Sequence, residues 1–210
     1  MNKSQTNNNL TNYSEPIGNY LSKLQNTDDL ANQPIGDYIE KQNKIEIRLT
    51  MGKWFVSNSE EHELIAPCLG SCVAVCIYET KAKIIGMAHI VFPSRQMVSH
   101  PNEEFPSARY ADEVIELLVQ EISKIASSKN LNLVAKLAGG AQMFKGVYNN
   151  KGFPLIGQGN VQTLKKELIK RNIPLKAADV GGTCGRTVSF DLSKGLMLVR
   201  RIGETEYSSI

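Results

Sequence analysis

Apolar and polar positions alternate with the spacing of β-strands through much of the chain after about residue 44. Ile45, Ile47 and Leu49 alternate with polar residues, and an apolar run at 54–56 follows a glycine turn. Two longer apolar runs, 73–78 and 84–92, flank a short polar segment, so we predict that they pair as a hairpin. Further strands are predicted at 131–137, 175–180, 187–192 and 196–202.

Two segments show the spacing of an amphipathic helix instead. Over residues 108–127 the apolar residues recur every three or four positions: Val114, Leu118, Ile122 and Ile125. A second helix is predicted over 160–171, where Asn160 is suited to cap the start and Pro174 lies just beyond the end. About eight strands and two main helices indicate an α+β domain in which the helices cover one sheet.

The first 43 residues differ from the rest of the chain. Ser, Thr, Asn and Gln make up 19 of them, and three lysines against five acids give −2, which leaves +5 on residues 44–210. Such a segment buries too little apolar surface to offset its ordering entropy, so we predict a disordered or partner-binding extension before a single domain. Within it, PIGNY at 16–20 recurs as PIGDY at 34–38. Coincidence, a short helical pair and a duplicated docking motif all remain open.

Composition and charge exclude several classes of protein. The net charge of +3 is spread without lysine or arginine clusters, which does not favour a nucleic-acid partner. The apolar runs are too short to span a bilayer, so no membrane insertion is expected. The polar start of the chain lacks the apolar segment of a signal peptide, and a cytoplasmic location with reduced cysteines is expected.

The most promising chemistry lies where a turn of small residues leads into a buried strand. Gly70 allows the chain to turn sharply, Ser71 follows it, and Cys72 stands at the start of the strand. Such a junction can expose a thiol and surround it with backbone N–H groups that stabilise a thiolate or an oxyanion. A buried cysteine that serves only packing fits the same pattern and stays an alternative.

His89 is the one histidine of three that falls inside an apolar strand; His62 and His100 have polar neighbours, and we expect them to be exposed. Seventeen residues separate Cys72 from His89, and the predicted hairpin would bring the two close enough to form a Cys–His pair. A histidine whose hydrogen bonds are satisfied in the core is the alternative.

The remaining cysteines do not form a metal-site pattern. Cys68, Cys72 and Cys76 recur every four residues, but they lie in a turn and a strand. In a strand that spacing separates Cys72 from Cys76 by roughly 13 Å, too far for one metal ion. Cys184 lies in a glycine-rich turn. We expect neither a metal nor an organic cofactor.

An ordered series of motifs runs through the body of the chain, from about residue 45 to residue 203. The motifs are LGSCV (69–73), GMAH (86–89) with Pro93, RYAD (109–112), AKLAGGAQMF (135–144), IG (156–157), NV (160–161), DVGG (179–182) and LVR (198–200). In content and spacing the series resembles the CheD family of chemoreceptor glutamine deamidases. The first 43 residues lie outside the resemblance.

The resemblance implies an α/β/β sandwich with mixed sheets and helices on one face. It implies a cysteine hydrolase that converts glutamine side chains of methyl-accepting chemotaxis receptors to glutamate. In that reading Cys72 is the nucleophile, His89 is the general base and acid, and Gly70 and Ser71 shape the turn and the oxyanion site. The family's third catalytic residue is a threonine at the position that Ala66 occupies here.

Two other functions stay open at this point. Because Ala66 has no hydroxyl, the protein could be a weakly active or inactive binding module that partners a CheC-type phosphatase, as the resemblance also implies. A redox sensor built on Cys68, Cys72 and Cys76 is the third reading. Substitutions distinguish these functions. A binding module would keep its cellular function in a Cys72→Ala variant. A redox sensor would be affected as much by Cys68→Ser and Cys76→Ser as by Cys72→Ala, whereas an enzyme would depend on Cys72 alone.

Overall fold

The computed structural model describes residues 38–41, 44–98, 107–143 and 155–210, within one compact unit that runs from Pro34 to Ile210. The strands in these residues are β1 (Tyr38–Lys41), β2 (Lys44–Arg48), β3 (Trp54–Ser57), β4 (His62–Leu69), β5 (Val73–Glu79), β6 (Ile84–Ile90), β7 (Leu133–Gly139), β8 (Leu175–Val180), β9 (Arg186–Asp191), β10 (Leu196–Arg201) and β11 (Ser208–Ser209). The helices are α2 (Ala111–Ala126), α3 (Ile156–Lys170) and the short 3₁₀-helices η2 (Arg95–Met97) and η3 (Ser107–Arg109).

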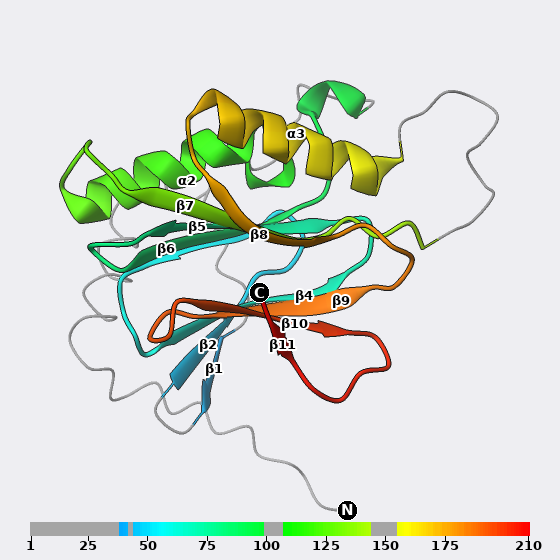
Figure 1. Cartoon of the computed structure of the whole chain (residues 1–210), viewed down its shortest axis with the longest axis horizontal. Helices are drawn as coiled ribbons and strands as arrows, with labels where there is room; N and C mark the ends of the chain where they lie inside the picture. The colour runs from blue at the N-terminus through cyan, green and yellow to red at the C-terminus, as the bar shows by residue number, and fades with distance from the viewer. Residues whose placement is uncertain (1–37, 42–43, 99–106, 144–154) are drawn as a thin grey trace, which may run out of the picture. The chain divides into compact units, whose positions relative to one another are not determined.

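The strands form two sheets that pack in layers with the helices. One sheet has six strands in the order β1-β2-β4-β9-β10-β11, and the other has five in the order β3-β6-β5-β7-β8. Both are mixed, because β2–β4 and β7–β8 are parallel pairs while the others are antiparallel. In Figure 1, α2 and α3 lie over one face of the five-stranded sheet, and the six-stranded sheet lies on its other side. This confirms the α+β class and the α/β/β sandwich.

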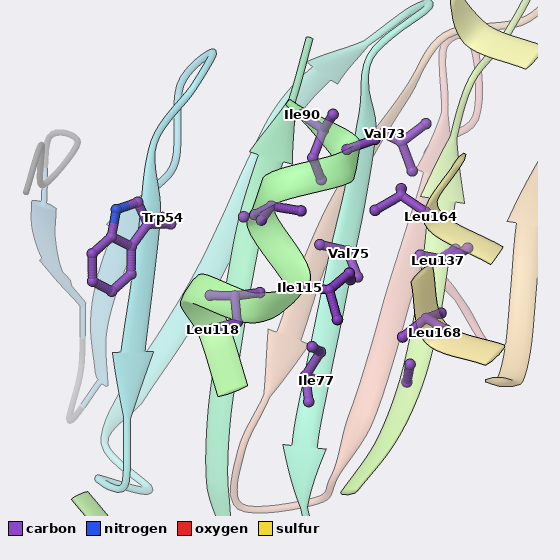
Figure 2. Close-up of a cluster of buried hydrophobic side chains, with 14 of the residues drawn as sticks. Trp54, Val73, Val75, Ile77, Ile90, Ile115, Leu118, Leu137, Leu164 and Leu168 are labelled. Carbon is purple, nitrogen blue, oxygen red and sulfur yellow. The ribbon is translucent and has the colours of Figure 1, made fainter. Parts of the chain in front are cut away.

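The alternation of side chains along β5 explains how one sheet serves two layers. Val73, Val75 and Ile77 belong to the core cluster beneath the helices, which Figure 2 shows. Tyr78 points the other way, and its ring lies 5.9 Å from that of Phe190 on β9 (centroid to centroid). Successive strand residues point to opposite faces, so both faces of β5 are buried. Each buried aliphatic side chain contributes about 1.5–3 kcal/mol.

Helix α2 forms where the periodicity predicts it. Val114, Leu118 and Ile122 are fully buried on its core-facing stripe. Acidic residues occupy its first turn and Lys124 its last, which complements the helix dipole. Ser127 ends the helix in the left-handed conformation, with φ of 50°. The helix begins at Ala111, three residues later than predicted, because residues up to Arg109 form the separate turn η3.

Strand β4 was not predicted from the sequence. Leu64, Ile65 and Ala66 are all buried, so the strand lacks the apolar–polar alternation of a half-exposed strand. Pro67 also argues against an internal strand, because proline cannot donate to the ladder. The structure accommodates it at a bulge, where the register between β4 and β9 shifts between Ala66 and Leu69.

Helix α3 begins four residues earlier than the sequence predicted. Its cap position is Leu155 and its first residue is Ile156, so Asn160 lies inside the helix. The prediction that Asn160 caps the helix is therefore wrong. Asn160 is completely buried because its side chain reaches into the neighbouring strand layer, as described below.

The proposed repeat and most of the predicted N-terminal extension lie outside the described residues. Within the first 43 residues, 38–41 form β1, which pairs antiparallel with β2. The boundary of the extension at residue 43 stays a prediction. Among the described residues, no helix is long and apolar enough to cross a membrane.

Candidate active site

Cys72 lies on the short connector that joins the two sheets. Strand β4 ends at Leu69 in the six-stranded sheet, and β5 begins at Val73 in the five-stranded sheet. Three residues, 70–72, therefore carry the chain from one layer to the next. A Cβ atom at Gly70 would lie 2.5 Å from Sδ of Met143, so a larger residue at this crossing would displace that flexible, exposed side chain.

A glycine pair after β7 holds the connector from behind. The backbone N–H of Gly140 donates to the Cys72 carbonyl at 2.7 Å, and that of Ala141 donates to the Gly70 carbonyl at 2.7 Å. Gly139 has a φ of 118°, and a Cβ atom there would overlap the Cys72 carbonyl oxygen. Only glycine tolerates both conditions. The glycine pair therefore forms a tight turn directly behind the connector.

Asn160 ties the connector to the strand that carries His89. Its Nδ2 donates to the backbone carbonyls of Ser71 and Val91, at 3.1 Å in each case. One side chain of α3 therefore bridges the Cys72 connector and the end of β6. The sequence placed Asn160 in the resemblance but assigned it only a capping role, because nothing in its local pattern reveals a partner 89 residues away.

The predicted hairpin is confirmed, and its register sets the start of β5, one residue after Cys72, opposite the end of β6, one residue after His89. Ala74 pairs with His89 and Val73 with Ile90, so the register places Cys72 two positions along from His89. His89 points to the side of its sheet that is turned toward the six-stranded sheet. The fold thus places the two residues that the sequence singled out at the same end of the hairpin, and their action as a pair stays a prediction.

The His89 ring is held in one orientation by a main-chain oxygen. Nδ1 lies 2.9 Å from the carbonyl oxygen of Leu49. A carbonyl can only accept, so Nδ1 carries the proton and Nε2 of the neutral ring keeps its lone pair. Nε2 is buried and has no hydrogen-bond partner in the part of the chain that the structure describes. Burial lowers the pKa of His89, and the bond to Leu49 partly opposes this, so the ring is neutral at pH 7.

The Cys72 thiol is held protonated by its surroundings. Burial raises its pKa, while the positive charge of Arg109 and the backbone N–H of Cys72 lower it. Arg109 comes from η3 and packs on the loop before β3, where a Cβ atom at Gly52 would lie 2.5 Å from its Cγ. A protonated thiol beside a neutral imidazole is a pair in which the base must take the proton before attack. The sequence analysis placed Arg109 in a motif of the resemblance but gave it no role, because only the tertiary structure brings its charge near Cys72.

The other cysteines and histidines are placed differently. Cys76 is completely buried in β5, which raises its pKa strongly, whereas Cys68 is exposed. His62 is buried and bonds to Oγ of Ser57 at 2.7 Å, so the prediction that it is exposed is wrong. His100 lies outside the described residues. Within the described ranges, no group of three or more His, Cys, Asp or Glu residues is arranged to hold a metal ion.

A cavity of about 730 Å³ opens beside the connector. Ser71 lines it, together with residues of α3, the turn at Gly140 and the turn at 181–182, but neither Cys72 nor His89 does. Three large apolar side chains that line it are also exposed to solvent: Met97, Met143 and Ile156. The cavity therefore lies beside the connector that carries Cys72 and presents apolar side chains to solvent.

Fold and site together define an α/β/β sandwich with a cysteine on the connector between its sheets and a histidine on the adjacent strand. The family model described as CheD chemotactic sensory transduction matches residues 91–201. The chain is 40% identical over 145 residues to the chemoreceptor glutamine deamidase CheD of Halalkalibacterium halodurans, an alignment that covers 69% of this chain and 87% of that protein.

Two further relatives bear the name probable chemoreceptor glutamine deamidase CheD. The protein from Desulfitobacterium hafniense is 41% identical over 144 residues, covering 68% of this chain and 86% of the relative. The protein from Pyrococcus abyssi is 38% identical over 158 residues, covering 75% and 92%. The chain belongs to the CheD family, which confirms the resemblance found in its motifs.

Proposed function

We propose that this protein is a chemoreceptor glutamine deamidase, which converts glutamine side chains of methyl-accepting chemotaxis receptors to glutamate. One observation carries the proposal: a buried imidazole, whose Nε2 has no hydrogen-bond partner among the described residues, lies at the end of the hairpin next to the connector that carries the Cys72 thiol, in a family whose relatives are named for this reaction. The substrate would be the cytoplasmic part of a receptor, so the protein would work in the cytoplasm, as its sequence predicts.

The first half of the reaction forms a thioester. Nε2 of His89 takes the proton of the Cys72 thiol, and the sulfur attacks the carbon of the glutamine side-chain amide. The negative charge that develops on the amide oxygen is stabilised by backbone N–H groups of the turn at Ser71 and Cys72. The protonated His89 then gives its proton to the nitrogen, the C–N bond breaks, and ammonia leaves.

The second half restores the enzyme. His89, again neutral, takes a proton from a water molecule that attacks the thioester carbon. The C–S bond breaks, the sulfur recovers a proton from His89, and glutamate is released. Neither a metal nor an organic cofactor takes part in these steps. The product bears a negative charge that the glutamine lacked, which changes the electrostatics of the receptor helix.

Arg109 and Asn160 have supporting roles in this proposal. The charge of Arg109 favours the thiolate, which lowers the cost of transferring the proton to His89. Asn160 fixes the distance between the connector and β6 through its two bonds to main-chain carbonyls. The apolar cavity beside Ser71 would receive the receptor segment next to the reacting glutamine.

Mass spectrometry of a receptor cytoplasmic domain tests the proposal directly. The receptor is incubated with the native protein, with Cys72→Ala or with Cys68→Ser, which removes an exposed thiol outside the pair. We expect glutamine-to-glutamate conversion with the native protein and Cys68→Ser but none with Cys72→Ala. Conversion that survives Cys72→Ala would exclude the thioester mechanism. No conversion by a folded native protein would exclude a deamidase.

The absence of a hydroxyl at Ala66 and the exposed apolar side chains around the cavity favour a second candidate, a binding module for a CheC-type phosphatase. In that case Cys72→Ala would leave binding and cellular function intact. The redox-sensor alternative is less well supported, because a sensor thiol must be accessible and Cys76 is completely buried.

A further inference from the structure

The Leu49 carbonyl can accept a hydrogen bond from His89 because the hydrogen bonding of the six-stranded sheet is interrupted beside it. Strands β2 and β4 are parallel, with Ile45 opposite His62 and Arg48 opposite Ile65. The backbone N–H of Ile45 donates to the Glu61 carbonyl at 2.8 Å, one residue before its partner. In a parallel ladder, the carbonyl of the same residue then faces the N–H one residue after the partner.

At the end of β2 the same pattern would require a hydrogen bond from the backbone of Pro67. The Leu49 N–H donates to the Ile65 carbonyl at 2.7 Å, so Leu49 stands opposite Ala66. The next ladder bond would run from the N–H of residue 67 to the Leu49 carbonyl. Residue 67 is Pro67, which has no N–H. The ladder ends there, and the Leu49 carbonyl receives no bond from β4.

The released carbonyl accepts from the His89 ring instead. Its oxygen lies 2.9 Å from Nδ1, inside the buried layer between the sheets. The backbone of His89 is hydrogen-bonded to the loop that follows Leu49. Gly52 N–H donates to the His89 carbonyl at 2.9 Å, and His89 N–H donates to the Lys53 carbonyl at 3.0 Å. Ring and backbone of His89 are thus held by one short stretch of chain.

We propose that Pro67 is a positioning residue for the catalytic base: by leaving the Leu49 carbonyl unpaired in the sheet, it lets that carbonyl orient His89 and select its tautomer. This rests on the proposed function, in which His89 acts through Nε2. Ala66, opposite Leu49, has no side-chain group that could do this work. A carbonyl selects the tautomer better than a hydroxyl would, since a hydroxyl can donate or accept while a carbonyl only accepts.

The Pro67→Ala variant tests the inference, because it restores an N–H that competes for the Leu49 oxygen. In protein labelled with ¹⁵N-histidine, the native His89 should show a protonated Nδ1 and an unprotonated Nε2, and Pro67→Ala should reduce that tautomer. A carbonyl has two lone pairs, so the competition weakens the bond, and deamidation should fall about 2- to 12-fold. Adding Ala66→Thr to Pro67→Ala should recover part of the loss by supplying a hydroxyl beside Leu49.

Pro174→Ala is the control, because it makes the same proline-to-alanine change at an exposed position in the connection between α3 and β8, far from His89 in sequence. It should change neither the tautomer nor the activity. A native His89 protonated on Nε2, or a folded Pro67→Ala variant with unchanged tautomer and activity, would overturn the inference. If Pro67→Ala does not fold, Pro67→Gly, which also restores the N–H, is measured in its place. If the tautomer shifts as expected but the native protein deamidates nothing, the orientation stands and the proposed function fails.

Discussion

The two faces of the five-stranded sheet carry different tasks. On the face under the helices, Val73, Val75 and Ile77 of β5 pack in an apolar cluster with side chains of α2 and α3. On the opposite face, His89 of β6 has a buried ring nitrogen with no hydrogen-bond partner among the described residues, and Cys72 is partly buried just before the start of β5. The same strand pair therefore stabilises the domain with one set of residues and positions its candidate chemistry with the other.

The difference between the faces shows how the fold can bury an unpaired polar atom without losing its stability. An unpaired polar atom in a core costs about 1–3 kcal/mol. The apolar face offsets this through the burial of several aliphatic side chains, each contributing a similar amount. Because the period of a strand is two residues, a substitution on one face should leave the other nearly unchanged. Three substitutions test that separation.

The largest expected effect comes from the face that holds the candidate chemistry. His89→Gln should lower deamidation by about 10²- to 10⁴-fold, because it removes the general base while keeping an amide that can donate to Leu49. The midpoint of thermal unfolding should change little. Rates from mass spectrometry, together with calorimetry, check both parts. A loss of activity that merely follows a loss of folded protein would contradict the separation of the two faces.

On the helix-covered face the effect should fall on stability instead. Ile77→Ala should lower the free energy of unfolding by about 2–5 kcal/mol, because it leaves a cavity under the helices. The activity of the folded fraction at low temperature should remain. Urea denaturation measures the stability. Ile169→Ala, at an exposed position of α3, is the control and should change it by less than about 0.5 kcal/mol.

The smallest effect concerns a charge beside the pair. Because Arg109 lowers the pKa of the Cys72 thiol, Arg109→Gln should raise that pKa. The rate of alkylation by iodoacetamide, which requires the thiolate, should then rise at a higher pH than in the native protein. Arg109→Lys keeps the charge and should give a profile closer to the native one. If the pH dependence of alkylation in Arg109→Gln coincides with that of the native protein, Arg109 does not influence the Cys72 thiol.

Several parts of the fold could be predicted from local pattern. The period of β5 and β6 and the polar segment between them predicted the hairpin, and the stripe of α2 predicted that helix. Strand β4 was not predicted, because it is buried on both faces and contains Pro67, which locally argues against a strand. The bridging role of Asn160 was also not predicted, because a polar residue near a predicted helix start resembles a cap until its distant partners are known.

The amino-acid sequence by itself determined the α+β class, the family and the hairpin that holds Cys72 and His89 at one end, because all three depend on residues in local order or on a hairpin of short separation. Only the tertiary structure decided which nitrogen of His89 is free, that Arg109 lies near the thiol, and that Pro67 releases the Leu49 carbonyl. Those features depend on hydrogen bonds and charges between residues tens of positions apart. Periodicity along the chain holds no information about them until the two sheets have packed.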